Sequence, residues 1–294
     1  MLGPPNDVTP ETADRPDDEA LFPELLIQLL SIDEQNAKAG LVLLDRYGVI
    51  SVIEVMNHLF SELTEAVTRL ASESTERSPF VLNDDGSLDF RNDARMRVYL
   101  ALSAPQQFYM ATSNLLRGHV SDVFPHVRRA VEGAGIAYLS LTEPDIGDLF
   151  VANDRAAFRT RTRTDRILRR DDPLTNELWM SNDFANRQIH NNIESFASRM
   201  RHSAPDGAFR IDIQYHELDA DSLSHYMNAC IWMLRVAERV ARALAASFSL
   251  PADDVWYSML TYYRQLVDGL YADHAELLQS AFINDPVASP ESDA

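Results

Sequence analysis

Apolar residues recur at steps of three and four along most of the chain. The clearest stripe follows Asp221 and consists of Leu223, Met227, Cys230, Leu234, Ala237, Ala241, Leu244 and Phe248. A second stripe consists of Val52, Met56, Leu59, Leu63, Val67 and Leu70. Steps of three and four place side chains on one face of an α-helix, and such a face is buried against other helices. The pattern therefore predicts a mainly α fold, a multi-helix bundle.

Capping signals suggest where two of these helices begin. Ser51 and Glu54 fit a capping box, in which the serine oxygen accepts from a free N–H and the glutamate reaches back. Ser31 and Glu34 repeat the same spacing upstream. Gly48 suits the end of a helix that precedes Ser51.

Proline and glycine place further boundaries. Pro105 predicts a helix that starts after Ser103, because the first turn of a helix does not need the N–H that proline lacks. That helix is expected to stop at Gly118, and the next to begin near Ser121. Further helices are expected from Pro144, Leu174 and Ser249. The last of these would bury Val255, Met259, Tyr262, Leu266 and Leu270.

Two segments depart from the helical spacing. Residues 80–82 and 88–90 flank the turn signal Asp84-Asp85-Gly86, which predicts a small β hairpin. Residues 209–215 alternate strictly between apolar and other positions, which is typical of one strand or an extended arm. A single strand needs a partner, and the segment 80–90 is the expected one.

Composition bounds the domain organisation and the class of protein. The chain has 294 residues, 46% of them hydrophobic, and 45 acidic against 26 basic side chains, a net charge of −19. Residues 1–19 and 283–294 are acidic and poor in apolar surface, which predicts disordered tails on a folded body at 20–282. No apolar run approaches the roughly 20 residues that span a bilayer, so we expect a cytoplasmic protein without membrane contact.

Cys230 is the single cysteine. It excludes an internal disulfide and any multi-cysteine metal site. Its place in an apolar stripe indicates a small core residue. No cofactor or metal site is predicted.

The segment 155–170 holds seven arginines and one acidic residue. If it were one helix, five arginines would share a face: Arg155, Arg159, Arg163, Arg166 and Arg170. That face could follow the phosphates of a nucleic acid. The interpretation that we prefer is that it covers acidic surface of this protein, internally or at a subunit interface, because the rest of the body is acidic.

A second polar cluster lies between residues 187 and 194. On a helix, Arg187, His190, Asn191 and Glu194 share one face. His190 and Glu194 could share a proton, although two ligands are too few to predict a metal site. The alternative is a histidine that makes a buried polar contact between helices. Arg128 and Glu132 are expected to form an ion pair on another helix.

Two passages carry a family resemblance. The first is Asn114-Leu115-Leu116-Arg117-Gly118 followed by Arg128-Arg129-x-x-Glu132, and the second is the later His190-Asn191 with Ser195 beyond it. Over about residues 94–248 the chain resembles bacterial all-helical proteins related to the HEPN (higher eukaryotes and prokaryotes nucleotide-binding) domains. The resemblance implies a bundle in which an Arg-Gly turn joins two helices. It also implies that a later helix brings a histidine near the second of them.

The resemblance leaves two functions open. The first is a non-catalytic, oligomeric interaction protein, in a bacterial defence or toxin–antitoxin setting, that uses the arginine-rich face and a polar groove around Arg128, Glu132 and His190. The alternative is a metal-independent ribonuclease, with His190 as acid–base and Arg117, Arg128 or Arg187 as phosphate clamp. HEPN ribonucleases carry Arg-x(4–6)-His on a helix. Here that spacing occurs only at Arg210 and His216, on the strand-like segment.

Overall fold

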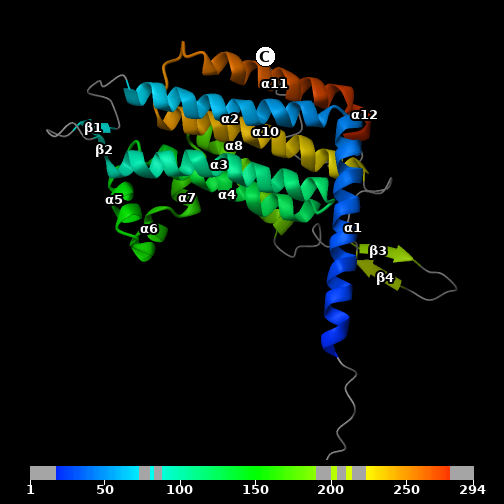
Figure 1. The fold of residues 1–294 in the computed structure, drawn as a ribbon. Coiled ribbons are helices and arrows are strands. Elements are labelled where there is room, and N and C mark those ends of the chain that lie inside the picture. The colour runs from blue at the N-terminus through cyan, green and yellow to red at the C-terminus, as the bar shows by residue number, and fades with distance from the viewer. Residues whose placement is uncertain are drawn as a thin grey trace, which may run out of the picture.

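Helices form almost all of the regular structure in the computed structural model of the chain (Figure 1). The backbone is described for residues 18–72, 80–82, 88–189, 200–203, 210–213 and 223–278, and side chains for 30–70, 91–189 and 223–278. Most of the long helices run side by side, and α1 crosses one end of the bundle (Figure 1). The predicted mainly α, multi-helix fold is confirmed.

The described elements fall into long helices, short helices and strands. The long helices are α1 (Asp18–Arg46), α2 (Val49–Ser72), α3 (Asn92–Leu116), α4 (Val120–Leu139), α8 (Pro173–Ile189), α10 (Leu223–Ser247) and α11 (Trp256–Asp273). The shorter helices are α5 (Asp145–Val151), α6 (Arg155–Arg161), α7 (Thr164–Ile167) and α12 (Ala275–Leu278). The strands are β1 (Phe80–Leu82), β2 (Leu88–Phe90), β3 (Met200–Ser203) and β4 (Arg210–Ile213).

Helices α4 and α10 form the centre of the bundle. The stripe predicted on α10 is buried from Met227 to Leu244, and its two ends, Leu223 and Phe248, are partly buried. The buried part includes Cys230, which confirms the assignment of this residue to the core. Trp232 of α10 packs against Phe124 of α4 and Phe184 of α8, with ring centroids 5.2 Å away in both cases. Burial of a large apolar side chain stabilises a fold by about 1.5–3 kcal/mol. This aromatic cluster therefore ties three helices into one core.

Helices α2 and α11 form a second layer over α10. The predicted stripe of α2 is buried through Val52, Met56, Leu59 and Leu63. The indole N–H of Trp256, at the start of α11, donates to the carbonyl of Leu59 at 3.1 Å. The layer thus joins segments that lie 197 residues apart in a chain of 294.

The buried face of α11 differs from the predicted one by one residue. The residues that face the core are Trp256, Leu260, Tyr263, Val267 and Leu270. Val255 and Tyr262 were expected there and are 63% and 51% exposed. The two buried aromatic residues explain the shift, because each also satisfies its polar group: Trp256 on Leu59 as above, and Tyr263 by donating to the carbonyl of Leu234 at 2.8 Å.

The capping boxes predicted at residues 31 and 51 are wrong. Ser31 lies inside α1, and α2 begins at Val49. The hydroxyl of Ser51 does not accept from a free N–H; it donates to the carbonyl of Gly48 at 2.8 Å. Gly48 has a φ of +72°, a conformation that glycine adopts readily, and it separates α1 from α2 as expected.

Pro105 lies inside α3 rather than in the first turn of a helix. Proline removes one hydrogen bond from a helix interior, at a cost of about 3 kcal/mol. The helix continues because it packs along α4, with Ala104, Phe108 and Ala111 buried. Its predicted end is confirmed: Gly118 has a φ of +76° and its N–H donates to Leu115.

Two short antiparallel strand pairs accompany the helices. In the first, Phe80 pairs with Phe90 and Leu82 with Leu88. In the second, Met200 pairs with Ile213 and Ser203 with Arg210. The expectation that the segment 209–215 would pair with the segment 80–90 is therefore wrong. A partner nearer in sequence closes a shorter loop at a lower entropy cost.

The predicted acidic tails concern residues 1–19 and 283–294. Residues 1–17 and 283–294 lie outside the described residues. No helix in the described ranges is long and apolar enough to cross a membrane.

Candidate functional site

The corner between α3 and α4 carries Arg117, one of the predicted phosphate ligands. Its Nε donates to the carboxylate of Asp33 on α1 at 2.8 Å, and its Nη1 donates to the carbonyl of Ser113 at 2.9 Å. His119 lies 3.7 Å from the same carboxylate. Arg117 therefore fastens α1 to the corner that the Arg-Gly turn makes.

Arg128 and Glu132 form the predicted ion pair on α4. Their Nε and Oε1 atoms lie 2.8 Å apart, and both side chains are about one-third exposed. An exposed pair at this spacing stabilises a helix by about 0.3–0.5 kcal/mol. Its geometry matches an ordinary surface pair.

Arg187 lies near the end of α8, where it pairs with Asp183 at 3.1 Å. The other members of that predicted cluster, His190, Asn191 and Glu194, lie outside the described residues. Of the residues predicted to line the groove, the structure therefore describes Arg128 and Glu132 on α4 but not His190.

The register of α4 against α8 separates the predicted arginines. Phe124 contacts Phe184, and the hydroxyl of Tyr138 donates to Asp172, so the two helices are antiparallel. Arg128 and Ile189, the last residue of α8, lie on opposite sides of the Phe124–Phe184 contact. At 1.5 Å per residue they are about 13 Å apart along the helix axes. Arg117, Arg128 and Arg187 each pair with a different carboxylate, Asp33, Glu132 and Asp183 respectively.

The arginine-rich segment is not one helix. It forms the two short helices α6 and α7, which Thr162 and Arg163 separate, with Arg163 in an extended conformation. The five arginines expected on one face, Arg155, Arg159, Arg163, Arg166 and Arg170, therefore do not form a continuous stripe.

Glu143, before α5, holds this segment in place. Its carboxylate accepts from Arg161 at 2.7 Å and from Arg166 at 2.9 Å. Arg161 also pairs with Asp145 at 2.8 Å. One carboxylate thus joins α6 to α7, and its aspartate neighbour adds a second contact.

Other arginines of the segment also meet partners within this protein. Arg163 pairs with Asp165 at 3.1 Å, and Arg169 with Asp171 at 2.7 Å. The guanidinium of Arg170 lies 3.7 Å from the ring centroid of Trp179. Residues 143–172 contain seven acidic and seven basic side chains, so this region carries no net charge. Of the two interpretations of the arginines, these contacts favour the internal one.

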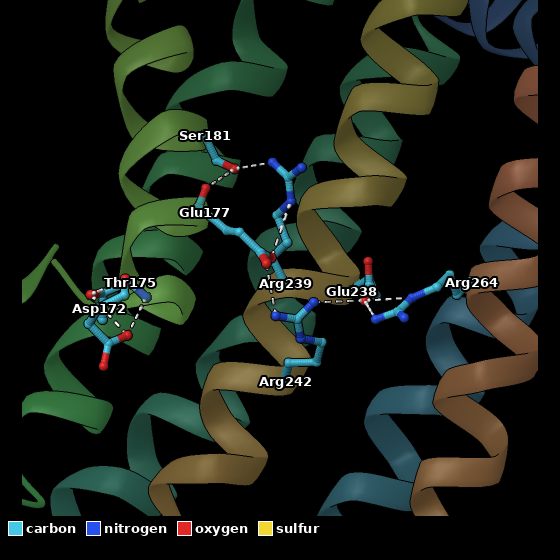
Figure 2. A network of polar contacts seen from close by, with 8 residues as sticks. All are labelled: Asp172, Thr175, Glu177, Ser181, Glu238, Arg239, Arg242 and Arg264. Carbon is cyan, nitrogen blue, oxygen red and sulfur yellow. Dashed lines mark hydrogen bonds and ion pairs between the residues drawn. The ribbon is translucent and has the colours of Figure 1, made fainter. Parts of the chain in front are cut away.

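A polar network that sequence reasoning missed joins α8, α10 and α11 (Figure 2). Glu177 of α8 accepts from Arg242 at 3.1 Å and lies 3.8 Å from Arg239. Arg242 lies 3.4 Å from Glu238, which also accepts from Arg264 of α11 at 2.5 Å. Figure 2 shows these side chains as a continuous chain from one outer helix to the other.

Arg239 is the most buried arginine of this network, with 14% of its side chain exposed. Its Nη1 donates to the hydroxyl of Ser181 at 3.1 Å. Burial lowers the pKa of Arg239, and the nearby Glu177 and Glu238 oppose that shift. A sequence signal existed: Arg235, Arg239 and Arg242 follow one edge of the α10 stripe at steps of four and three.

The outer face of α3 is the second feature that was missed. Residues 98–116 contain no charged side chain, the longest such stretch in the chain. Four large side chains stand exposed along it: Tyr99 (60%), Leu102 (53%), Tyr109 (68%) and Met110 (40%). Gln106 is exposed between them. In Figure 1, α3 lies at the near side of the bundle.

This face, defined by Tyr99, Leu102, Gln106, Tyr109 and Met110 and called the α3 face below, extends toward α5. The ring of Tyr99 lies 5.5 Å from that of Phe150, which in turn lies 5.7 Å from Phe158.

Exposed apolar side chains also occur on α1, but in a different setting. Leu30, Ile32, Leu41 and Val42 lie on that helix. Charged residues interrupt them, among them the exposed pair Glu34 and Lys38, whose charged atoms lie 2.7 Å apart. The α3 face is thus distinguished by its lack of charge rather than by exposure alone.

No group of three or more His, Cys, Asp or Glu side chains with metal-binding geometry occurs among the described residues. Comparison with known proteins found no matching family model, no matching curated protein and no matching solved structure.

Proposed function

We propose that this protein is a helical interaction protein and that its binding surface is the α3 face. The observation that carries the proposal is the exposed, uncharged stripe of tyrosine, leucine and methionine on α3. Interface cores are enriched in tyrosine and methionine and depleted of charge relative to the rest of a protein surface. The α3 face has this composition on a chain whose net charge is −19.

The charged residues support the same proposal. Arg117, Arg161, Arg166 and Arg242 each bond a carboxylate on another element of this protein. Such contacts hold helices and turns together, and an arginine so engaged has fewer N–H groups left for a ligand. The α3 face, in contrast, has large side chains with no layer of the described structure over them.

A photo-crosslinking amino acid in place of Tyr109 tests this proposal in cells that make the full chain. We expect an adduct of defined mass at this position. The same substitution at Tyr262 of α11, which is 51% exposed, is the control and should give none. Equal yields at the two positions, or no adduct at Tyr109, would contradict the proposal.

The ribonuclease alternative has its own test. In that function His190 would move the proton of the attacking 2′-hydroxyl while an arginine binds the phosphate. Purified protein and its His190→Ala variant would be incubated with total RNA. If the protein is an interaction protein, the two should not differ in RNA cleavage. Cleavage that depends on His190 would contradict our proposal and support the ribonuclease function.

A further inference from the structure

We infer that the partner on the α3 face is a second copy of this chain, with the two α3 helices packed antiparallel about a two-fold axis at Gln106. This inference rests on the proposed function and adds the identity and geometry of the partner. Three observations carry it: the spacing of the exposed side chains, the distribution of charge and the length of the face.

The spacing of the side chains suits a two-fold axis. In an antiparallel pair, residues equally far from the axis face each other. Leu102 and Met110 are each four residues from Gln106, so an apolar side chain meets an apolar one. Tyr99 and Ser113 are each seven residues away, so two hydroxyl groups meet. Tyr109 and Ser103 are each three residues away, so hydroxyl groups meet there as well. Steps of three, four and seven stay on one face of a helix, so these pairs can lie in one contact.

The amide of Gln106 fits the axis itself. A side-chain amide has both a donor and an acceptor, so two copies of it can bond each other across a two-fold axis. A carboxylate or an ammonium group at the same point would face a group of the same charge on the second copy.

The charge distribution favours a second copy over a different protein. Two copies that each carry −19 repel each other over most of their surfaces. An uncharged face is where they can approach with the least repulsion. A basic partner would be attracted to acidic surface instead, and residues 98–116 offer none. The arginines that flank the stretch already pair within the chain, Arg97 with Asp93 at 3.0 Å and Arg117 with Asp33 at 2.8 Å.

The length of the face sets the expected strength. From Tyr99 to Ser113, α3 is about 21 Å long. A stable interface buries about 800 Å² on each partner, more than one helix face of this length supplies. The ring of Phe150 beside Tyr99 continues the apolar surface toward α5. We therefore expect a dimer that dissociates reversibly on dilution.

Sedimentation equilibrium of the full chain over a range of concentrations tests the association. Leu102→Glu puts a charge opposite Met110 and should raise the dimer dissociation constant by roughly 10- to 100-fold. Val42→Glu is the matched control, because Val42 is 69% exposed on α1 and the charge change is the same. Helix content by circular dichroism shows whether each variant is folded.

A cysteine placed on the axis tests the geometry. Gln106→Cys should form a disulfide with its own copy under mild oxidation. Tyr99→Cys should not, because the two cysteines would lie about 21 Å apart along the helices. Cys230 does not interfere, since it is buried and burial raises the pKa of its thiol.

The outcomes separate this inference from the function on which it rests. A dimer that Leu102→Glu weakens and Gln106→Cys locks supports it. A monomer at every concentration overturns it, as does a dimer that tolerates Leu102→Glu and leaves Gln106→Cys reduced. If a monomer still crosslinks through position 109 to a different protein, the proposed function survives and only the second copy is excluded. Without crosslinks at position 109, both fail.

Discussion

At the scale of single residues, Gly40 shows how closely α1 crosses α3. A methyl group at this position would collide with the carbonyl of Leu116. Glycine is therefore required where the two backbones approach each other. Gly269 in α11 is the opposite case, because a methyl group there would meet nothing within 4 Å.

The two glycines predict substitutions of opposite sign. Gly40→Ala should lower the free energy of unfolding by about 1–3 kcal/mol, since α1 must move away from α3. Gly269→Ala should raise it by about 0.5–1 kcal/mol, because alanine is the better helix former. Urea unfolding followed by circular dichroism measures both. Equal effects of the two substitutions would show that α1 does not dock at Gly40.

His225, near the start of α10, predicts a dependence of stability on pH. Burial lowers its pKa from 6.5 to about 4. Between these values the unfolded chain binds a proton that the folded chain does not. Stability is therefore fully present above pH 6.5 and falls as the pH drops toward 4, by about 3 kcal/mol in all.

Unfolding in urea at a series of pH values measures this dependence. His225→Gln should flatten it between pH 6.5 and 4, and the difference between the two curves isolates His225 from the other titrating groups. Curves that stay parallel would mean that His225 titrates normally in the folded protein.

At the scale of elements, the network of Figure 2 sets the position of α8 against α10. Glu177→Gln should remove one of the two carboxylates near the largely buried Arg239 and weaken the bond to Arg242. Loss of one partner from a half-buried group costs more than loss of an exposed pair. We expect a decrease of about 1–3 kcal/mol in the free energy of unfolding.

Asp165→Asn is the control for this prediction. It removes the same charge from the pair with Arg163, in which both side chains are about two-thirds exposed. Its effect should stay within about 0.5 kcal/mol. A similar loss from Asp165→Asn and Glu177→Gln, measured by urea unfolding, would contradict a bracing role for the network.

The helices with long apolar stripes could be predicted from sequence, and other features could not. The apolar stripes of α2 and α10 predict their helices correctly, because packing of a whole apolar face supplies most of the stability of a helix in a protein. Pro105 wrongly predicted the start of a helix, because packing of α3 against α4 outweighs the free-energy cost of a proline inside the helix. The face of α11 shifted by one residue because the hydrogen bonds of Trp256 and Tyr263 depend on carbonyls far away in the sequence.

The candidate site was less predictable for a related reason. The spacing of the arginines in residues 155–170 suggested one face only if the segment were one helix, and it breaks at Thr162. Their carboxylate partners are set by the fold, as Glu143 shows. The α3 face, in contrast, could have been found from the uncharged stretch 98–116 alone.

At the scale of the whole molecule, net charge predicts how salt affects association. Two copies that each carry −19 repel each other, and added salt screens this repulsion. Dimerisation through the uncharged α3 face should therefore strengthen from about 0.05 M to 0.3 M salt. Nucleic-acid binding through arginines would weaken over the same range.

Sedimentation equilibrium at the two salt concentrations distinguishes these cases. The Val42→Glu variant carries one more negative charge away from the α3 face and should show the same trend. A dimer that dissociates as salt is added would mean that ion pairs hold it, and the α3 face would not be its interface.

The layer that α2 forms with α11 affects how the chain is made. The buried side of α2 is completed by Trp256, whose indole N–H donates to Leu59, 197 residues earlier. At 5–20 residues per second, a ribosome needs about 10–40 s to add that much chain. Until α11 is made, the native cover of the apolar stripe of α2 stays incomplete, although α3 and α10 already pack against it. We therefore expect chaperones that recognise apolar segments to bind the nascent chain at α2. Their release should depend on the synthesis of α11.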